Sequence, residues 1–238
     1  MSRWGVYSNE RLLIDISLWS ASLATLGADV QRMAPYADLF HIDVSDAHFV
    51  PGLLFFPDLV AAIRSLTTVP FHVHLMTADP PALIGPFVDA GADILTVHFE
   101  TGPAVTAALA AIQTAGKSAG LAIGLDTAPE MLVPYLDQID LVVMMGTRLG
   151  VKGQELDPRA CERIQTMRQM LMQYGVVDRI RIFADGGIRS HTVPALRTAG
   201  ADAIIPGSLV FGSPDLPATI AWLHGLPIAA VRAGTGAV

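Results

Sequence analysis

Residues 179–208 read RIRIFADGGIRSHTVPALRTAGADAIIPGS, and this stretch decides the fold. It begins with the apolar run Arg179–Ala184, continues with a helical pattern over His191–Ala199 and ends with a second apolar run, Ala203–Ile205. This order predicts a strand–helix–strand unit with parallel strands. The segment Ala199-Gly200-Ala201-Asp202, like Ala90-Gly91-Ala92-Asp93 earlier in the chain, places a glycine where a helix ends, a position that favours left-handed backbone. The next strand starts directly after it.

The same alternation recurs along the chain. Short apolar runs typical of buried strands are Leu12–Leu18, Leu39–Val44, Val69–Leu75, Ile94–Phe99, Ala119–Leu125, Leu141–Met145, Arg179–Ala184 and Ala203–Ile205. Amphipathic segments that predict helices are Leu23–Met33, Pro57–Ser65, Pro80–Ala90, Pro103–Thr114, Pro129–Leu136, Asp157–Tyr174, His191–Ala199 and Pro214–Leu223. Eight such units close into an α/β fold, the (β/α)8 TIM barrel, which takes about 200–250 residues.

A doubly wound parallel sheet is the alternative architecture. It usually has fewer strands and shows a Gly-x-Gly-x-x-Gly turn after its first strand. Here Leu18-Trp19-Ser20-Ala21-Ser22 follows the first run, and the next glycine is Gly27. We therefore predict one barrel domain over residues 1–238, with a Gly- and Ala-rich tail over 225–238 that is partly disordered.

The composition excludes several classes of protein. Charged residues make up 16% and hydrophobic residues 52% of the 238 positions, which excludes a disordered chain. The net charge of −7, with no basic tract, argues against nucleic acid as a partner. The longest uncharged stretches, Thr101–Gly116 and Leu216–Val231, are too short for a membrane span, and the first residues show no signal-like apolar run. The single Cys161 excludes an internal disulfide and fits a reducing, cytoplasmic location.

Polar residues cluster where the predicted strands end, and active sites of barrels lie at those ends. The carboxyl ends of these predicted strands read His41-Ile42-Asp43-Val44-Ser45-Asp46, His72-Val73-His74-Leu75-Met76, His98-Phe99-Glu100 and Ala184-Asp185-Gly186-Gly187. Alternation along a strand puts His41 and Asp43 on one face, and His72 and His74 on one face. Converging imidazoles and carboxylates predict a mixed nitrogen and oxygen site for a divalent metal, Zn²⁺, Fe²⁺, Mn²⁺ or Co²⁺. The alternative is a set of separately hydrogen-bonded rim residues.

Two glycine-containing loops follow the last two predicted strands. They are Asp185-Gly186-Gly187-Ile188 and Pro206-Gly207-Ser208. Loops in these two places are the recurrent phosphate site of the barrel, because backbone amides and a helix start face the anion. The alternative interpretation is that these glycines only allow the chain to turn in ordinary loops. Met76 and Met145 close apolar strand ends, where they are either core residues or walls of a substrate pocket.

The segment Gly146–Gln154 is polar and contains regularly spaced glycines. It is either a lid that closes over a substrate or a flexible connector. Its lid candidates are Arg148, Lys152 and Gln154. A lysine for Schiff-base chemistry is poorly supported, since Lys117 precedes its strand and Lys152 lies in this loop. Cys161 lies within a helical pattern and is interpreted as a packing residue.

From about Leu12 to Gly212 the chain resembles the ribulose-phosphate 3-epimerase family. The segment 41–51, HIDVSDAHFVP, is similar to the family pattern His-x-Asp-x-Met-Asp-Gly-His-Phe-x-Pro-Asn. Further matches are Val73-His74-Leu75-Met76, Asp185-Gly186-Gly187, Gly207-Ser208, and Ile16-Ser17-Leu18 where the family has Pro-Ser-Ile. The resemblance implies a barrel of the ribulose-phosphate-binding type and a homo-oligomer.

The resemblance also implies a function. It implies a metal-dependent epimerase that inverts C3 of a ketose phosphate, of the ribulose 5-phosphate/xylulose 5-phosphate type, through a cis-enediolate. One divalent ion per chain would be held by His41, Asp43, His74 and Asp185, and Asp43 and Asp185 would act as acid and base. Substrate contacts would come from Ser17, His74, Met76, Met145, Gly186, Gly187, Gly207 and Ser208.

The chain departs from the family pattern most in the segment 145–154. The family reads Met-x-Val-(Asn/Glu/Asp)-Pro-Gly-Phe-Gly-Gly-Gln. Here Arg148, Leu149, Val151 and Lys152 replace the acid or amide, the proline, the phenylalanine and a glycine. Other substrates therefore stay open, namely allulose 6-phosphate or a tetrulose phosphate, as does aldose–ketose isomerisation. A metal-independent phosphosugar isomerase or lyase and a non-catalytic phosphosugar-binding barrel are further alternatives.

Overall fold

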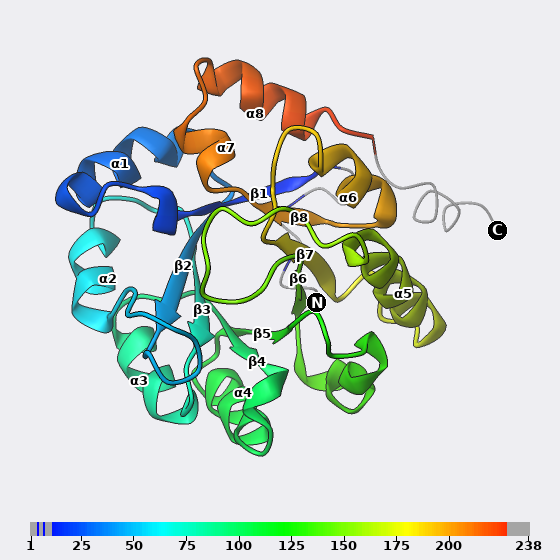
Figure 1. The fold of residues 1–238 in the computed structure, drawn as a ribbon. Helices are drawn as coiled ribbons and strands as arrows, with labels where there is room; N and C mark the ends of the chain where they lie inside the picture. The colour runs from blue at the N-terminus through cyan, green and yellow to red at the C-terminus, as the bar shows by residue number, and fades with distance from the viewer. Residues whose placement is uncertain (1–3, 5–6, 8–10, 228–238) are drawn as a thin grey trace.

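A computed structural model of the chain describes Trp4, Tyr7 and residues 11–227. Eight parallel strands form a closed barrel in chain order, which confirms the predicted TIM barrel (Figure 1). The strands are β1 (Leu13–Ser17), β2 (Leu39–Ser45), β3 (Phe71–Met76), β4 (Ile94–His98), β5 (Ser118–Ile123), β6 (Leu141–Met145), β7 (Arg181–Asp185) and β8 (Ala203–Ile205). The pairing of Leu13 with Ala203 closes the barrel. Within the predicted tail, residues 228–238 lie outside the described residues.

Helices surround the barrel (Figure 1). They are α1 (Leu26–Met33), α2 (Pro57–Arg64), α3 (Pro81–Asp89), α4 (Ala104–Thr114), α5 (Ala160–Gln173), α6 (Val193–Ala199), α7 (Ser208–Phe211) and α8 (Leu216–His224). Short 3-10 turns are η1 (Leu18–Ser20), η2 (Leu23–Thr25), η3 (Ala34–Tyr36) and η4 (Phe99–Thr101). The predicted helix over Pro129–Leu136 is instead a longer 3-10 helix, η5 (Pro129–Gln138). Pro134 lies inside it, and a proline cannot donate the bond that an α-helix needs there.

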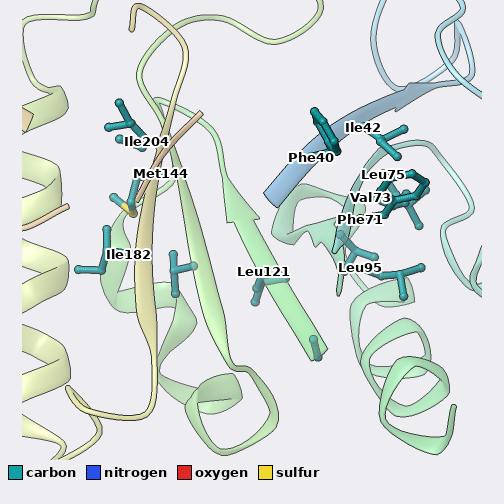
Figure 2. Packing of buried hydrophobic residues seen from close by; sticks show 14 of the residues in the cluster. Phe40, Ile42, Phe71, Val73, Leu75, Leu95, Leu121, Met144, Ile182 and Ile204 are labelled. Carbon is teal, nitrogen blue, oxygen red and sulfur yellow. The ribbon is translucent and has the colours of Figure 1, made fainter. Parts of the chain in front are cut away.

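The main hydrophobic core lies between the strands and the helices (Figure 2). Outward-facing strand residues such as Phe40, Ile42 and Val73 belong to it and are buried. The alternate residues of the same strands point into the barrel. The inward positions of β5–β8 are mostly apolar, while those of β1–β4 include Asp15, Ser17, His41, Asp43, His72, His74, Thr96 and His98, all buried. The barrel interior therefore has a polar half and an apolar half.

Four aspartates, each directly before an even-numbered strand, accept a backbone N–H from the preceding strand. They are Asp38 with Ile14, Asp93 with Phe71, Asp140 with Ala119 and Asp202 with Ile182, at 2.9–3.0 Å. We call these four residues the strand clamps. Asp93 and Asp202 belong to the Ala-Gly-Ala-Asp segments, and their glycines, Gly91 and Gly200, have φ of +99° and +117°. The prediction of left-handed glycines at these joints is therefore confirmed.

Candidate active site

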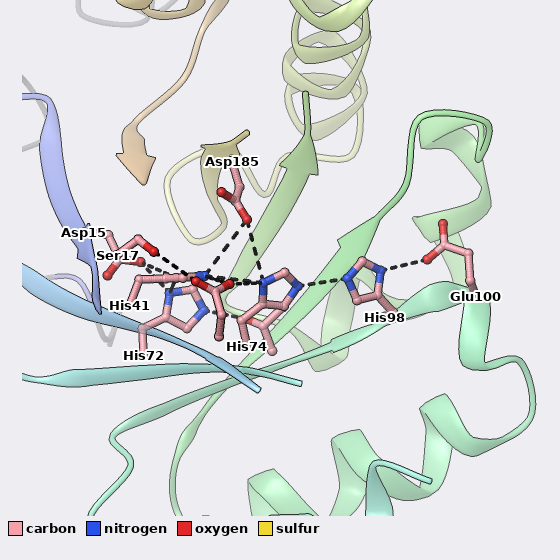
Figure 3. Close-up of polar contacts among 10 residues, drawn as sticks. Asp15, Ser17, His41, His72, His74, His98, Glu100 and Asp185 are labelled. Atoms are coloured by element: carbon pink, nitrogen blue, oxygen red, sulfur yellow. Dashed lines mark hydrogen bonds and ion pairs between the residues drawn. The ribbon is translucent and has the colours of Figure 1, made fainter. Parts of the chain in front are cut away.

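Four side chains from three strands meet at the carboxyl end of the barrel (Figure 3). They are His41 and Asp43 of β2, His74 of β3 and Asp185 of β7, and we call them the His/Asp group. His41 Nε2 lies 3.3 Å from His74 Nδ1 and 3.2 Å from Asp43 Oδ1. Asp185 Oδ2 lies 4.0 Å from His41 Nε2 and 3.7 Å from His74 Nδ1. The structure thus brings together the residues that the resemblance implied as metal ligands.

These separations fit a single metal ion. Ligand atoms about 2.1 Å from a tetrahedral metal stand about 3.4 Å apart, and the pairs above lie between 3.2 and 4.0 Å. A second group, Asp15, His41 and His72, fits less well. Asp15 Oδ2 lies 2.6 Å from His72 Nδ1 and 3.1 Å from His41 Nδ1, which are hydrogen-bond distances. The Asp15 carboxylate therefore accepts from both imidazoles and orients them.

The electrostatics of the His/Asp group favour a bound cation. Burial disfavours a charged His41, but the charges of Asp43 and Asp15 outweigh it and raise the pKa of His41 well above its ordinary value. Burial acts to raise the pKa of Asp43, yet the charge of His41 and its hydrogen bond to Asp43 lower it. Burial lowers the pKa of His74 to about 3. A neutral imidazole with a free nitrogen lone pair is the form that binds metal, so His74 is ready to bind an ion, whereas His41 releases its proton when an ion binds.

The two carboxyl groups differ in acidity. Burial, together with the nearby charge of Asp43, raises the pKa of Asp185 to about 7. Ser17 Oγ donates a 2.9 Å hydrogen bond to Asp43 Oδ2, which supports the ionised form of Asp43. Two carboxyl groups whose acidities are pushed apart can serve as an acid and a base in one reaction.

A cavity of about 340 Å³ lies above the His/Asp group. Its size suits a small metabolite. The predicted residues on its wall are Ser17, Asp43, Met76, Met145, Arg148, Lys152, Gln154, Asp185, Gly186, Gly187, Gly207 and Ser208. His41 and His74 are completely buried and lie below this wall. Both carboxylates therefore face the cavity, and the two imidazoles lie beneath them.

The two glycine loops meet on this wall. Gly186 and Gly187 have φ of +86° and +68°, and Gly207 precedes helix α7. A Cβ at residue 187 would lie 2.7 Å from Leu156 Cα, so the loop has no room for a side chain there. Glycine keeps the backbone accessible at such a turn.

The segment between β6 and α5 covers the cavity and crosses in front of the barrel in Figure 1. Lys152 Nζ donates to the Trp19 carbonyl at 2.5 Å and lies 4.9 Å from the centre of the Trp19 ring. A Cβ at Gly150 would lie 2.9 Å from Val50 Cβ, which shows how closely this segment approaches the loop after β2. The segment therefore contacts two other loops.

Several residues singled out in the sequence do not join the site. His48, the histidine near the end of the segment 41–51, is exposed, and its ring bonds to the Asp46 carbonyl. His72 lies deeper in the barrel beside Asp15. Lys117 precedes β5, and Cys161 is half-buried against the core, as a packing residue should be.

Other residues of the site were missed in the sequence. The cavity wall also contains Trp19, Ser20, Thr147 and Arg189. Below it lies Asp15, two positions before Ser17 on the same face of β1. Strand alternation from Ser17 points to Asp15, whereas the loop residues leave no such pattern.

The fold and site define a TIM barrel with a buried two-histidine, two-carboxylate group under a small cavity. The family model described as "Ribulose-phosphate 3 epimerase family" matches residues 13–211. A ribulose-phosphate 3-epimerase of Rhodobacter capsulatus is 39% identical over 226 residues, covering 93% of this chain and 94% of that protein. One of Bacillus subtilis is 35% identical over 210 residues, covering 88% and 96%. The chain belongs to the ribulose-phosphate 3-epimerase family, and it is an enzyme of the isomerase class.

Solved structures of low sequence identity share the same fold. A 3-keto-L-gulonate-6-phosphate decarboxylase of Vibrio cholerae matches with a TM-score of 0.67 at 18% identity, covering 90% of this chain and 95% of that chain. An orotidine 5'-phosphate decarboxylase of Pyrococcus horikoshii matches with a TM-score of 0.64 at 18% identity, covering 89% and 97%. At this identity the likeness concerns the barrel architecture alone.

Proposed function

We propose that the protein is a metal-dependent 3-epimerase of a ketose phosphate, of the ribulose 5-phosphate/xylulose 5-phosphate type. The observation that supports this most is the pair of carboxylates, Asp43 and Asp185, facing one cavity with two imidazoles between and beneath them. Family membership supports the same reaction. A divalent ion held by the His/Asp group would supply positive charge to the substrate oxygens as negative charge develops on them.

The two aspartates carry out the proton transfers. Inversion at C3 needs removal of the C3 proton, which leaves its electron pair in a cis-enediolate, and return of a proton to the opposite face. At neutral pH Asp43 is ionised and Asp185, whose pKa is about 7, is poised to hold a proton. In one direction Asp43 removes the proton and Asp185 returns one. For the other epimer the roles are exchanged.

The rest of the cavity binds the remainder of the substrate in this proposal. The amides around Gly186, Gly187, Gly207 and Ser208 bind the phosphate. Ser17 is a polar contact, and Met76 and Met145 form apolar walls. The segment containing Arg148, Lys152 and Gln154 is the lid, which excludes water from the enediolate.

Proton NMR in D₂O with a panel of phosphoketoses tests the proposed function. We expect exchange of the C3 proton with ribulose 5-phosphate or xylulose 5-phosphate. In Asp185→Asn we expect loss of epimerisation and loss of exchange for the epimer whose C3 proton Asp185 removes. The matched control is Asp178→Asn, because Asp178 is exposed and away from the cavity. Faster exchange with allulose 6-phosphate or a tetrulose phosphate would reassign the substrate. Binding without exchange across the panel would indicate a non-catalytic barrel. Full activity after complete metal removal would refute the proposed metal dependence of the reaction.

We also propose a cytoplasmic homo-oligomer, on the basis of the family resemblance and the single cysteine. No helix within the described residues has the length and apolar character needed to cross a membrane. Sedimentation velocity tests the assembly, and a monomer at micromolar concentration would contradict it.

A further inference from the structure

His98 and Glu100 extend the His/Asp group toward the loop after β5 (Figure 3). His98 is the last residue of β4, and Glu100 lies in η4. His74 Nε2 and His98 Nε2 are 2.9 Å apart, and His98 Nδ1 lies 3.0 Å from Glu100 Oε2. The two rings stack at 4.9 Å with an angle of 27° between their planes. A continuous hydrogen-bonded path therefore joins His74 to a carboxylate outside the His/Asp group.

If the His74 and His98 imidazoles are both neutral, only one placement of their protons completes the hydrogen bonds of this path. Glu100 is ionised and only accepts, so His98 Nδ1 carries a proton and donates to it. The other nitrogen of a neutral His98 ring, Nε2, must then accept. His74 Nε2 therefore carries a proton and donates to it, which leaves the lone pair of His74 Nδ1 directed at His41, Asp43 and Asp185.

The far end of the path is firmly held. Glu100 Oε1 accepts from the Gly124 amide at 2.7 Å and from the Thr127 hydroxyl. Arg163 in turn donates to the carbonyls of Gly124 at 2.6 Å and Thr127 at 2.8 Å. Burial acts to raise the pKa of Glu100, but bonds from His98, Thr127 and Gly124 outweigh it and lower this pKa to about 2. Glu100 is thus a fixed negative charge.

We propose that Glu100 and His98 are positioning residues that set the metal affinity of the site by fixing the tautomer and orientation of His74. This rests on the proposed metal site. Carboxylates that accept from metal-binding histidines commonly have this effect. His41 already has such a partner, since its Nδ1 lies 3.1 Å from Asp15 Oδ2. Among the residues that the structure describes, no carboxylate contacts His74 Nε2 directly, and His98 carries the influence of Glu100 across that gap.

The test is Glu100→Gln, which keeps the size of the side chain and an oxygen for Gly124 but removes the charge. We expect Zn²⁺ and Co²⁺ affinity, measured by competition with a chromophoric chelator, to fall about 10- to 100-fold. The melting temperature of the metal-free protein should stay near that of the wild type. Glu130→Gln, the same change at an exposed position, is the matched control and should leave both quantities unchanged.

A second pair of variants addresses His98 itself. In His98→Gln the amide can still accept from His74 and donate to Glu100, whereas His98→Leu can do neither. We expect the Gln variant to retain more metal affinity than the Leu variant. Equal affinities in the wild type, Glu100→Gln and both His98 variants would overturn the proposal.

Imidazole ¹⁵N NMR of the metal-free wild type tests the proposed tautomers independently of the proposed metal binding. We expect His74 protonated at Nε2 and His98 at Nδ1, with loss of this preference in Glu100→Gln. His74 protonated at Nδ1 in the wild type would overturn the relay, whether or not the protein binds metal. A wild type with these tautomers but no measurable affinity for either ion would instead refute the proposed metal function.

Discussion

Replacing Asp185 by asparagine should stabilise the metal-free protein at alkaline pH, although it abolishes the proposed activity. The pKa of Asp185 is raised to about 7 by its burial and by the charge of Asp43. In an unfolded chain an aspartate has a pKa of about 3.9. Between these two values the folded protein binds a proton that the unfolded chain does not, so the free energy of unfolding falls as pH rises.

The size of the effect follows from the two pKa values. A rise in the pKa of Asp185 from about 4 in the unfolded chain to about 7 in the folded protein corresponds to about 4 kcal/mol of unfolding free energy. This cost of ionising Asp185 is absent near pH 4, grows through pH 5–7 and is complete above about pH 8. Asparagine has no charge to bury. The variant should therefore exceed the wild type in unfolding free energy by up to about 4 kcal/mol at pH 8, and by little near pH 4.

Urea unfolding of chelator-treated protein at several pH values between 4.5 and 8.5 measures this difference, with Asp178→Asn as a control that should follow the wild type. A difference that is constant with pH, or that grows toward low pH, would refute the reasoning. Saturating Zn²⁺ should reverse the order, because the wild type gains binding energy that the variant largely lacks.

Three further predictions concern other parts of the barrel. Gly120→Ala should lower the free energy of unfolding by about 1–3 kcal/mol in urea titrations, because its Cβ would collide with Thr96 Oγ1 inside the barrel. Lys152→Met removes the bond to the Trp19 carbonyl across the cavity. We expect KM for the phosphorylated ketose to rise about tenfold or more, and an unchanged KM would argue against a lid role. Gly187→Ala should weaken competitive inhibition by inorganic phosphate in steady-state kinetics, since the added carbon pushes the loop out of place.

The number of strands and the identity of the central residues could be predicted from the sequence. Hydrophobic runs and their alternation with helices are local patterns, and they place His41 and Asp43 on one face of a strand. The strand-end pattern also marks His74 and Asp185, and the family resemblance groups them with His41 and Asp43 as metal ligands. The prediction of an α-helix over Pro129–Leu136 was wrong because Pro134 interrupts the α-helical hydrogen bonding. That proline is itself visible in the sequence.

The relay through His98 depends on information that one sequence does not contain. Strand alternation shows that His98 points into the barrel, but not which residue it meets. That depends on the register, in which His74 is paired with Thr96, so that His98 is offset along the neighbouring strand. Glu100 follows the strand in a 3-10 turn, where no periodicity applies. The contacts of the segment between β6 and α5 are equally unpredictable, because they involve Trp19 and Val50 in other loops.

The strand clamps have a consequence for the order of folding. Each joins residues that are only 20–24 positions apart in the chain. The entropy lost in closing a loop rises with its length, so these four contacts cost less to form than the pairing of Leu13 with Ala203. The barrel can thus assemble as four quarters, each held at its base by one aspartate, before its ends meet. Joining β1 to β8 then becomes the late, slow step, and it is also the step that brings Asp185 beside the histidines.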